Sequence, residues 1–230
     1  MIIQGLWIGS SLSQYEYNSI KSWLDNGFEY HLYVYEPIGN IPINTIIKDG
    51  NDIIPFEELK LYRDCYSVFS DVFRYKLLYL KGNAWVDCDL YCIRHFKTDT
   101  PYKFLSEKTI KEGAFRSKLP YNVLNSFIYI KDANMDFALE LYTKAKQYYD
   151  KLETKKQSCK NVGLDAYKWL GGGKLLKKMI DKYELMDYIA DYKFGFPIPW
   201  WHFNKLFQSG ITTFNICLLY TSPSPRDVEE

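Results

Sequence analysis

Short apolar runs alternate with amphipathic stretches along the first part of the chain. The apolar run over residues 2–8 predicts a strand. Ser13 and Glu16 have the spacing of a capping box, which predicts a helix that continues to Asn26-Gly27. Residues 29–36 are rich in Tyr and Val, residue types typical of strands. The first part of the chain therefore indicates a strand, a helix and a second strand.

The same alternation continues through the rest of the chain. Residues 45–48 predict a short strand, and the spacing of apolar residues over 56–80 predicts a long helix that ends at Gly82. The other expected elements are strands at 84–90, 102–106 and 126–130 and helices at 134–152 and 175–180. Such alternation favours an α/β fold with a largely parallel sheet, in which ligands bind at the carboxyl ends of the strands.

The length and composition favour one domain followed by a non-native C-terminal tail. The 230 residues are the size of one domain, and neither a repeat nor a low-complexity linker divides them. Residues 217–230 differ in composition from the rest and resemble the translated read-through of a sequencing adapter. We therefore expect a single domain over residues 1–216 and a non-native tail over 217–230.

Charge and cysteine content exclude several classes of protein. Lys and Arg number 29 against 28 Asp and Glu, so no general field draws nucleic acid or an anionic membrane surface to the protein. No apolar run approaches the ~18 residues of a membrane span. The five cysteines lack the spacing of a zinc site or a disulfide framework, so reduced thiols in the cytoplasm fit best.

Asp87 and Asp89 are the strongest candidates for chemistry. In a strand, both side chains project to one side, ~7 Å apart along the backbone, while Cys88 projects to the other. Mg²⁺ and Mn²⁺ are commonly held by one or two carboxylates together with substrate phosphates. The pair therefore predicts a divalent-ion site for a nucleoside diphosphate. The alternative is a solvated strand end, because a D-x-D motif also arises by chance.

Four sequence blocks together are more specific than the acidic pair. The blocks are Gly5-Leu6-Trp7-Ile8-Gly9, Ser70-Asp71-Val72-Phe73-Arg74-Tyr75, Gly82-Asn83-Ala84-Trp85-Val86-Asp87-Cys88-Asp89 and Pro197-Ile198-Pro199-Trp200-Trp201. In this order they resemble the DXD sugar-binding glycosyltransferases of family 32, over roughly residues 2–207. The resemblance implies a Rossmann-like glycosyltransferase A fold, a UDP-sugar or related donor, a Mn²⁺ or Mg²⁺ cofactor, retention of anomeric configuration and a role in polysaccharide biosynthesis.

The resemblance also implies roles for residues around the donor. Trp7 matches the aromatic residue that stacks on the donor base, with Ile8 and Gly9 beside it. Asp71 and Arg74 match an S-D-x-x-R motif, in which the carboxylate contacts sugar hydroxyls and the guanidinium opposes phosphate or orients the carboxylate. From spacing alone, these two residues predict only a surface ion pair on one helix.

Three further positions are weaker candidates. Trp85 has the strand parity of the two aspartates, so it faces the same cleft or belongs to the core. Asn125 lies where the family often has a polar residue near the donor sugar. His202 can supply a late metal ligand beside Asp87 and Asp89, although a lone His is more often an ordinary surface or core residue.

These observations lead to one main hypothesis and two alternatives. The chain is expected to be a metal-dependent glycosyltransferase that moves a sugar from a nucleotide-sugar donor to a glycan or other hydroxyl acceptor. One alternative is a catalytically inactive nucleotide-sugar-binding module. The other is a phosphohydrolase with Asp87 as its nucleophile, which lacks the expected N-terminal position and a supporting downstream Lys.

Overall fold

The computed structural model describes residues 1–62, 66–108, 121–153, 172–196 and 219–221. The strands are β1 (Ile2–Leu6), β2 (Glu29–Val34), β3 (Ile46–Asp49), β4 (Asn83–Val86), β5 (Leu90–Cys92), β6 (Tyr102–Lys108), β7 (Tyr121–Ile130) and β8 (Leu219–Thr221). The α-helices are α1 (Gln14–Asp25), α2 (Tyr66–Lys81), α3 (Asp136–Glu153), α5 (Gly173–Lys182) and α6 (Tyr192–Gly195). Three 3-10 helices are η1 (Gly50–Asp52), η2 (Phe56–Tyr62) and η3 (Met186–Tyr188).

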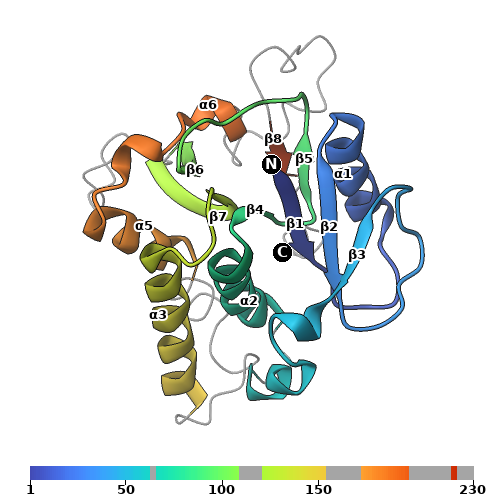
Figure 1. Ribbon diagram of the computed structural model, residues 1–230, viewed down its shortest axis with the longest axis horizontal. Helices are drawn as coiled ribbons and strands as arrows, with labels where there is room; N and C mark the ends of the chain where they lie inside the picture. The colour runs from blue at the N-terminus through green and yellow to red at the C-terminus, as the bar shows by residue number, and fades with distance from the viewer. Residues whose placement is uncertain (63–65, 109–120, 154–171, 197–218, 222–230) are drawn as a thin grey trace, which may run out of the picture.

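A mixed sheet lies at the centre of the molecule (Figure 1). Its six strands have the order β3-β2-β1-β4-β7-β6. The first four strands run parallel, β7 runs antiparallel to β4, and β6 runs antiparallel to β7. The predicted α/β fold with a largely parallel sheet is therefore confirmed, with an antiparallel pair at one edge.

Two hydrophobic clusters cover the two faces of the sheet. Successive residues of a strand point to opposite faces, and β4 shows this directly. Trp85 packs in the cluster that α2, α3 and α5 cover, whereas Ala84 and Val86 pack in the cluster that contains Ile20 and Trp23 of α1. The alternation along β4 thus places apolar side chains in both layers.

Local signals in the sequence fix the ends of two helices. The capping box of α1 is confirmed, since Ser13 accepts from the backbone of Tyr15 and Glu16 accepts from the backbone of Ser13. After α2, Gly82 has a φ of +62°, and a Cβ there would lie 2.8 Å from the backbone carbon of Asp132. Only glycine fits this turn, because other residues would meet immovable backbone.

Two predicted elements differ from those observed. The helix expected over residues 56–80 is divided into η2 and α2. The strand expected over 84–90 ends at Val86, and the amide of Leu90 donates to the carbonyl of Asp87 at 3.0 Å in a turn. The chain turns here because Leu90 is drawn into the core, where its carbonyl accepts from the indole of Trp23 at 2.7 Å.

Part of the predicted tail takes part in a second, smaller sheet. Residues Leu219–Thr221 form β8, which pairs antiparallel with β5. The rest of residues 217–230 lies outside the described residues, and the foreign origin of this segment stays a prediction. Cys88 and Cys92 are buried free thiols. Within the described part of the chain, no helix is both long and apolar enough to cross a bilayer.

Candidate functional site

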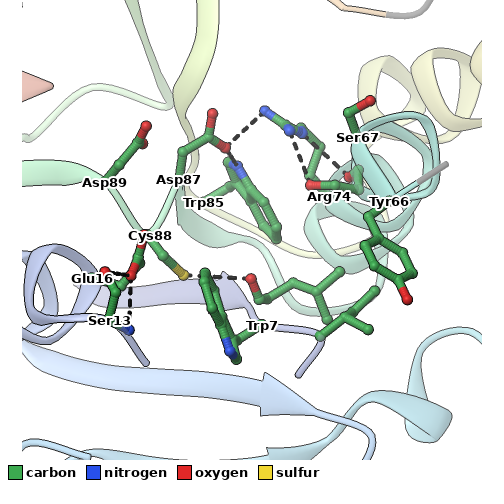
Figure 2. A pocket seen from close by; sticks show the side chains of 13 residues that line it. Trp7, Ser13, Glu16, Tyr66, Ser67, Arg74, Trp85, Asp87, Cys88 and Asp89 are labelled. Atoms are coloured by element: carbon green, nitrogen blue, oxygen red, sulfur yellow. Dashed lines mark hydrogen bonds and ion pairs between the residues drawn. The ribbon is translucent and has the colours of Figure 1, made fainter. Parts of the chain in front are cut away.

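A cavity of about 520 Å³ lies where β1 and β4 end (Figure 2). Its position agrees with the general rule that ligands bind at the carboxyl ends of parallel strands. The end of β1 and the chain after it, the start of α1, the first half of α2, and the end of β4 with the segment after it all contribute. The lining residues are Leu6, Trp7, Ile8, Ser13, Glu16, Tyr66, Ser67, Ser70, Arg74, Trp85, Asp87, Cys88 and Asp89.

Arg74 connects the two acidic motifs. Its Nη1 lies 3.0 Å from Oδ1 of Asp87, and its Nη2 lies 3.3 Å from Oδ1 of Asp71. The ion pair predicted for Asp71 and Arg74 is confirmed, but its predicted place on the surface is wrong, since these residues are only 7% and 5% exposed. They are buried because α2 turns this face toward β7 and the cavity instead of toward solvent. The guanidinium therefore holds the carboxylates of α2 and of the segment after β4 together.

Neighbouring groups fix the orientation of this guanidinium. Arg74 donates from Nη1 to the carbonyl oxygen of Asn125 at 2.7 Å and from Nη2 to the hydroxyl of Ser70 at 3.1 Å. Its Cζ lies 4.9 Å from the ring centroid of Trp85. The side-chain amide of Asn125 donates to Oδ1 of Asp71 at 2.8 Å. The planar guanidinium of Arg can bond to several fixed partners in one plane at once, whereas the ammonium group of Lys cannot.

Trp85 serves both of the roles considered for it. Its side chain is almost fully buried in the core, at 2% exposure, yet its Nε1 donates to Oδ1 of Asp87 at 2.8 Å. Oδ1 of Asp87 therefore has two partners, since it accepts from the indole of Trp85 and forms an ion pair with the guanidinium of Arg74. No such partner is observed for Oδ2 among the described residues. Asp87 is held by one oxygen and can offer the other to a ligand.

Asp89 has a less compensated environment than Asp87. Burial, and then the negative charge of Asp87, raise the pKa of the Asp89 carboxyl from 3.8 to about 7. Among the described residues, no other side chain donates a hydrogen bond to it. A carboxylate in such surroundings favours a proton or a cation.

Cys88 lines the cavity together with the two aspartates, but its Sγ is directed toward the protein interior. Its Sγ donates to the carbonyl of Leu6 at 3.4 Å and lies 3.8 Å from the hydroxyl of Tyr30. Burial raises the pKa of the Cys88 thiol to about 12, so the group stays neutral. The predicted separation of Cys88 from its neighbours holds, but the turn after β4 produces it instead of strand alternation.

Gly5 leaves room for the groups that support this turn. A Cβ at Gly5 would lie 2.5 Å from Oη of Tyr30 and 3.2 Å from Sγ of Cys88. Both neighbours are buried and cannot retreat into solvent. The space beneath the Asp87–Asp89 turn is therefore filled, with no room for a methyl group.

Gly5→Ala is expected to lower the free energy of unfolding by about 1–3 kcal/mol, because overpacking a closed core forces neighbours to shift. Urea unfolding measures this loss. Gly39→Ala is the matched control, since the nearest atom to a Cβ there is 3.7 Å away. Adding Tyr30→Phe to Gly5→Ala removes the closest contact and should recover part of the loss. Equal stability of the two alanine variants would show that Gly5 is not constrained.

Trp7 lies partly exposed on the side of the cavity formed by the end of β1. Its Nε1 donates to the carbonyl of Ser11 at 3.1 Å, which holds the indole across the loop. Gly9 has a φ of +147°, and a Cβ there would lie 3.3 Å from Trp7 Nε1. The loop therefore brings glycine backbone against the indole edge and leaves the ring at the cavity, as a stacking platform requires.

The structure brings most of the predicted site residues together. Six of them line the one cavity: Trp7, Ile8, Arg74, Trp85, Asp87 and Asp89. Asp71 and Asn125 lie behind Arg74 and bond to each other. His202 and the block at 197–201 lie outside the described residues. Within the described residues, no three His, Cys, Asp or Glu side chains are grouped so that they could hold one metal ion.

The sequence analysis missed five polar contributors to the cavity. These are Ser13, Glu16, Tyr66, Ser67 and Ser70. Ser70 stands in the S-D-x-x-R block, which was a usable signal. Glu16 was identified only as a helix cap, since no local pattern indicates that the cap of α1 also faces the ends of β1 and β4.

Comparison with known proteins identifies the fold. No family model and no curated protein matches the sequence. The structure resembles "PaToxG Glycosyltransferase", with a TM-score of 0.53 at 16% identity over 80% of this chain and 69% of that chain. It also resembles the UDP-bound glycosyltransferase domain of the YGT toxin, with a TM-score of 0.53 at 8% identity over 82% of this chain and 78% of that chain. The ligand-free form of that domain gives a TM-score of 0.51 at 10% identity over 82% and 79% of the two chains.

These likenesses show that the chain has the α/β fold of glycosyltransferase domains. This is the fold that the sequence predicts. At such low identities they establish architecture and leave the activity of this chain to be argued from its site.

Proposed function

We propose that this protein is a glycosyltransferase that takes a nucleoside-diphosphate-sugar, in the first instance a UDP-sugar, as its donor. The observation that carries the proposal is the cavity in which Arg74 joins Asp87 to Asp71, with Asp89 beside them. Its place at the ends of β1 and β4, in a fold shared with a UDP-bound glycosyltransferase domain, supports a nucleotide donor. The four sequence blocks support a place among the family 32-like enzymes.

The charges of the lining residues support a divalent cation. Among the described residues, the cavity has three carboxylates, on Glu16, Asp87 and Asp89, against one guanidinium on Arg74 that already pairs with Asp71 and Asp87. A diphosphate brings further negative charge and requires compensation. Asp89 and Oδ2 of Asp87 are the groups that would hold Mn²⁺ or Mg²⁺, with His202 as a further candidate. When bound, such an ion neutralises the charge that develops on the leaving diphosphate.

The chain's own residues orient the donor around this point. Trp7 presents an aromatic face for the base. Asp71, held by Asn125 behind Arg74, orients the guanidinium from the side away from the cavity. Arg74 keeps Asp87 fixed in position. In the mechanism that we propose, the acceptor hydroxyl attacks from the side of the leaving phosphate, which takes its proton, and configuration is retained.

A donor panel tests the proposal. UDP-, GDP- and TDP-sugars are assayed for sugar release and transfer to a glycan or other hydroxyl acceptor, with Mn²⁺ and with a chelator. Turnover that depends on the ion is expected with at least one donor. Donor binding without hydrolysis or transfer would instead indicate the inactive binding module, and no binding of any donor would overturn the proposal. A phosphohydrolase is disfavoured because Asp87 lacks the expected N-terminal position and a supporting downstream Lys.

Trp7→Ala is expected to weaken donor binding by about tenfold to a hundredfold, because a stacked base contributes ~1–3 kcal/mol. Calorimetry with UDP and Mn²⁺ measures the affinity, and thermal unfolding checks the fold. Tyr15→Ala is the control, since Tyr15 is a 55% exposed aromatic residue that does not line the cavity. Unchanged UDP affinity with a large loss of stability would make Trp7 a core residue.

A further inference from the structure

The first turn of α1 lies at the cavity. Ser13 and Glu16, which begin this helix, both line it. Free amides at a helix N-terminus, together with the helix dipole, ordinarily attract phosphate, and many nucleotide sites use a helix that follows the first strand in this way. The expected place for the donor's diphosphate would thus be the start of α1.

In this protein the start of α1 is already occupied by an internal anion. Oε2 of Glu16 accepts from the amide of Ser13 at 3.0 Å and also accepts from the Ser13 hydroxyl. Oγ of Ser13 in turn accepts from the amide of Tyr15 at 3.2 Å. The carboxylate of Glu16 therefore caps the start of α1 through Ser13, and its negative charge lies at the cavity, where it opposes a second anion.

The remaining charges add to this effect. Asp87 and Asp89 line the same cavity as Glu16, so three carboxylates of the described residues face it. Arg74, the only Lys or Arg among the described lining residues, is already paired with Asp71 and Asp87. A nucleoside diphosphate that arrives alone meets net negative charge at the cavity, whereas one that carries a divalent ion does not.

We propose that Glu16, through its negative charge at the cavity, makes nucleotide binding conditional on the metal ion by repelling a nucleoside diphosphate that lacks its cation. This inference rests on the proposed function. Glu16 acts through its charge, and it is not proposed as a ligand of the ion. The consequence is that the nucleotide binds as its complex with the ion.

Glu16→Gln separates the charge from the cap. Gln also forms the capping box at this helix position, so the bond from the Ser13 amide is kept and only the charge is lost. In calorimetry in the presence of a chelator, the variant is expected to bind UDP about tenfold more tightly than the wild type. The reason is that one nearby negative charge, partly screened by solvent, has been removed. With saturating Mn²⁺, the two proteins should agree within about threefold, because the ion already offsets that charge.

The control keeps the helix and changes a distant charge. Asp25→Asn removes one negative charge from the other end of α1, where Asp25 pairs with Lys21 on the surface. It should leave UDP affinity unchanged in chelator and in Mn²⁺. Thermal unfolding should give similar midpoints for all three proteins.

The outcomes of this experiment separate the two proposals. If Glu16→Gln stays folded and its affinity for UDP in chelator remains within twofold of the wild type, Glu16 does not control metal-free binding. If its affinity in Mn²⁺ falls more than tenfold, Glu16 is a ligand of the ion and the inference is wrong. If wild-type protein with Mn²⁺ binds none of UDP, GDP or TDP, the proposed function itself fails, and this inference fails with it.

Discussion

Asp89→Asn is expected to lower metal-dependent sugar transfer by about two orders of magnitude or more, while it stabilises the metal-free protein above pH 7. The first effect follows because Asn keeps the shape of the side chain but removes a charge from the proposed ion site. The second follows from the surroundings of Asp89, which disfavour its ionised form. Function and stability thus make opposite demands on this position.

The pH dependence has a definite sign. Burial and Asp87 raise the pKa of Asp89 from 3.8 to about 7, so between these values the folded protein binds more protons than the unfolded chain. The protonated Asp89 carboxyl therefore makes its full contribution to the free energy of unfolding below pH 4, and this contribution is lost as the pH rises to about 7. Asparagine does not titrate, so its advantage over Asp89 should grow across this window, to about 1–2 kcal/mol at pH 8. Urea unfolding in chelator at pH 5 and pH 8 measures the difference.

Cys88→Ala is the neighbouring control. It removes a small buried group and leaves the Tyr30 hydroxyl without its sulfur contact, so stability should fall by about 1–2 kcal/mol. Metal affinity and turnover should stay within about threefold of wild type, because Sγ of Cys88 is directed toward the protein interior. The metal site is wrong if Cys88→Ala is as inactive as Asp89→Asn in folded protein, or if Asp89→Asn keeps normal Mn²⁺-dependent activity.

Arg74→Met is expected to cost about 3–5 kcal/mol of stability and to abolish turnover, because it leaves two carboxylates without their shared cation. Arg74→Lys keeps the charge but cannot bridge Asp71, Asp87 and the Asn125 carbonyl in one plane, so it should restore only part of the stability. Urea unfolding and the donor assay, applied to both variants, test these expectations.

A surface ion pair and a second substitution provide the controls for Arg74. Lys21 pairs with Asp25 while about half exposed, at 48%, so Lys21→Met should change stability by less than about 1 kcal/mol. Adding Asp71→Asn to Arg74→Met removes one uncompensated charge and should recover stability without recovering activity. If Arg74→Met proves as mild as Lys21→Met, Arg74 does not hold the site together.

Signals within a few residues of sequence were sufficient for most of the scaffold. Three such signals each indicated an element or an element end that the structure contains. They are the capping box of Ser13 and Glu16, the glycine after α2, and the Tyr and Val residues of β2. These signals work because hydrogen bonds in caps and turns join residues two to four positions apart. The alternation of such elements was sufficient to predict the α/β fold.

The sequence also identified six of the thirteen residues that line the cavity, although part of the reasoning was wrong. Asp87 and Asp89 were expected on one strand, but β4 stops at Val86 and both follow it. Alternation predicts side-chain direction only while a neighbouring strand keeps the backbone extended. The end of β4 depends on Leu90, whose burial beside Trp23 involves a contact 67 positions away.

The sequence by itself determined the order of the strands and helices along the chain and the residue types available for a metal-dependent nucleotide site. Only the tertiary structure decided the electrostatics of that site. It buried Arg74 between two carboxylates, brought in the carbonyl of Asn125 from 51 positions away, and turned the α1 cap toward the cavity. The energy of a charge depends on burial and on neighbours within a few ångströms, and packing between distant segments sets both.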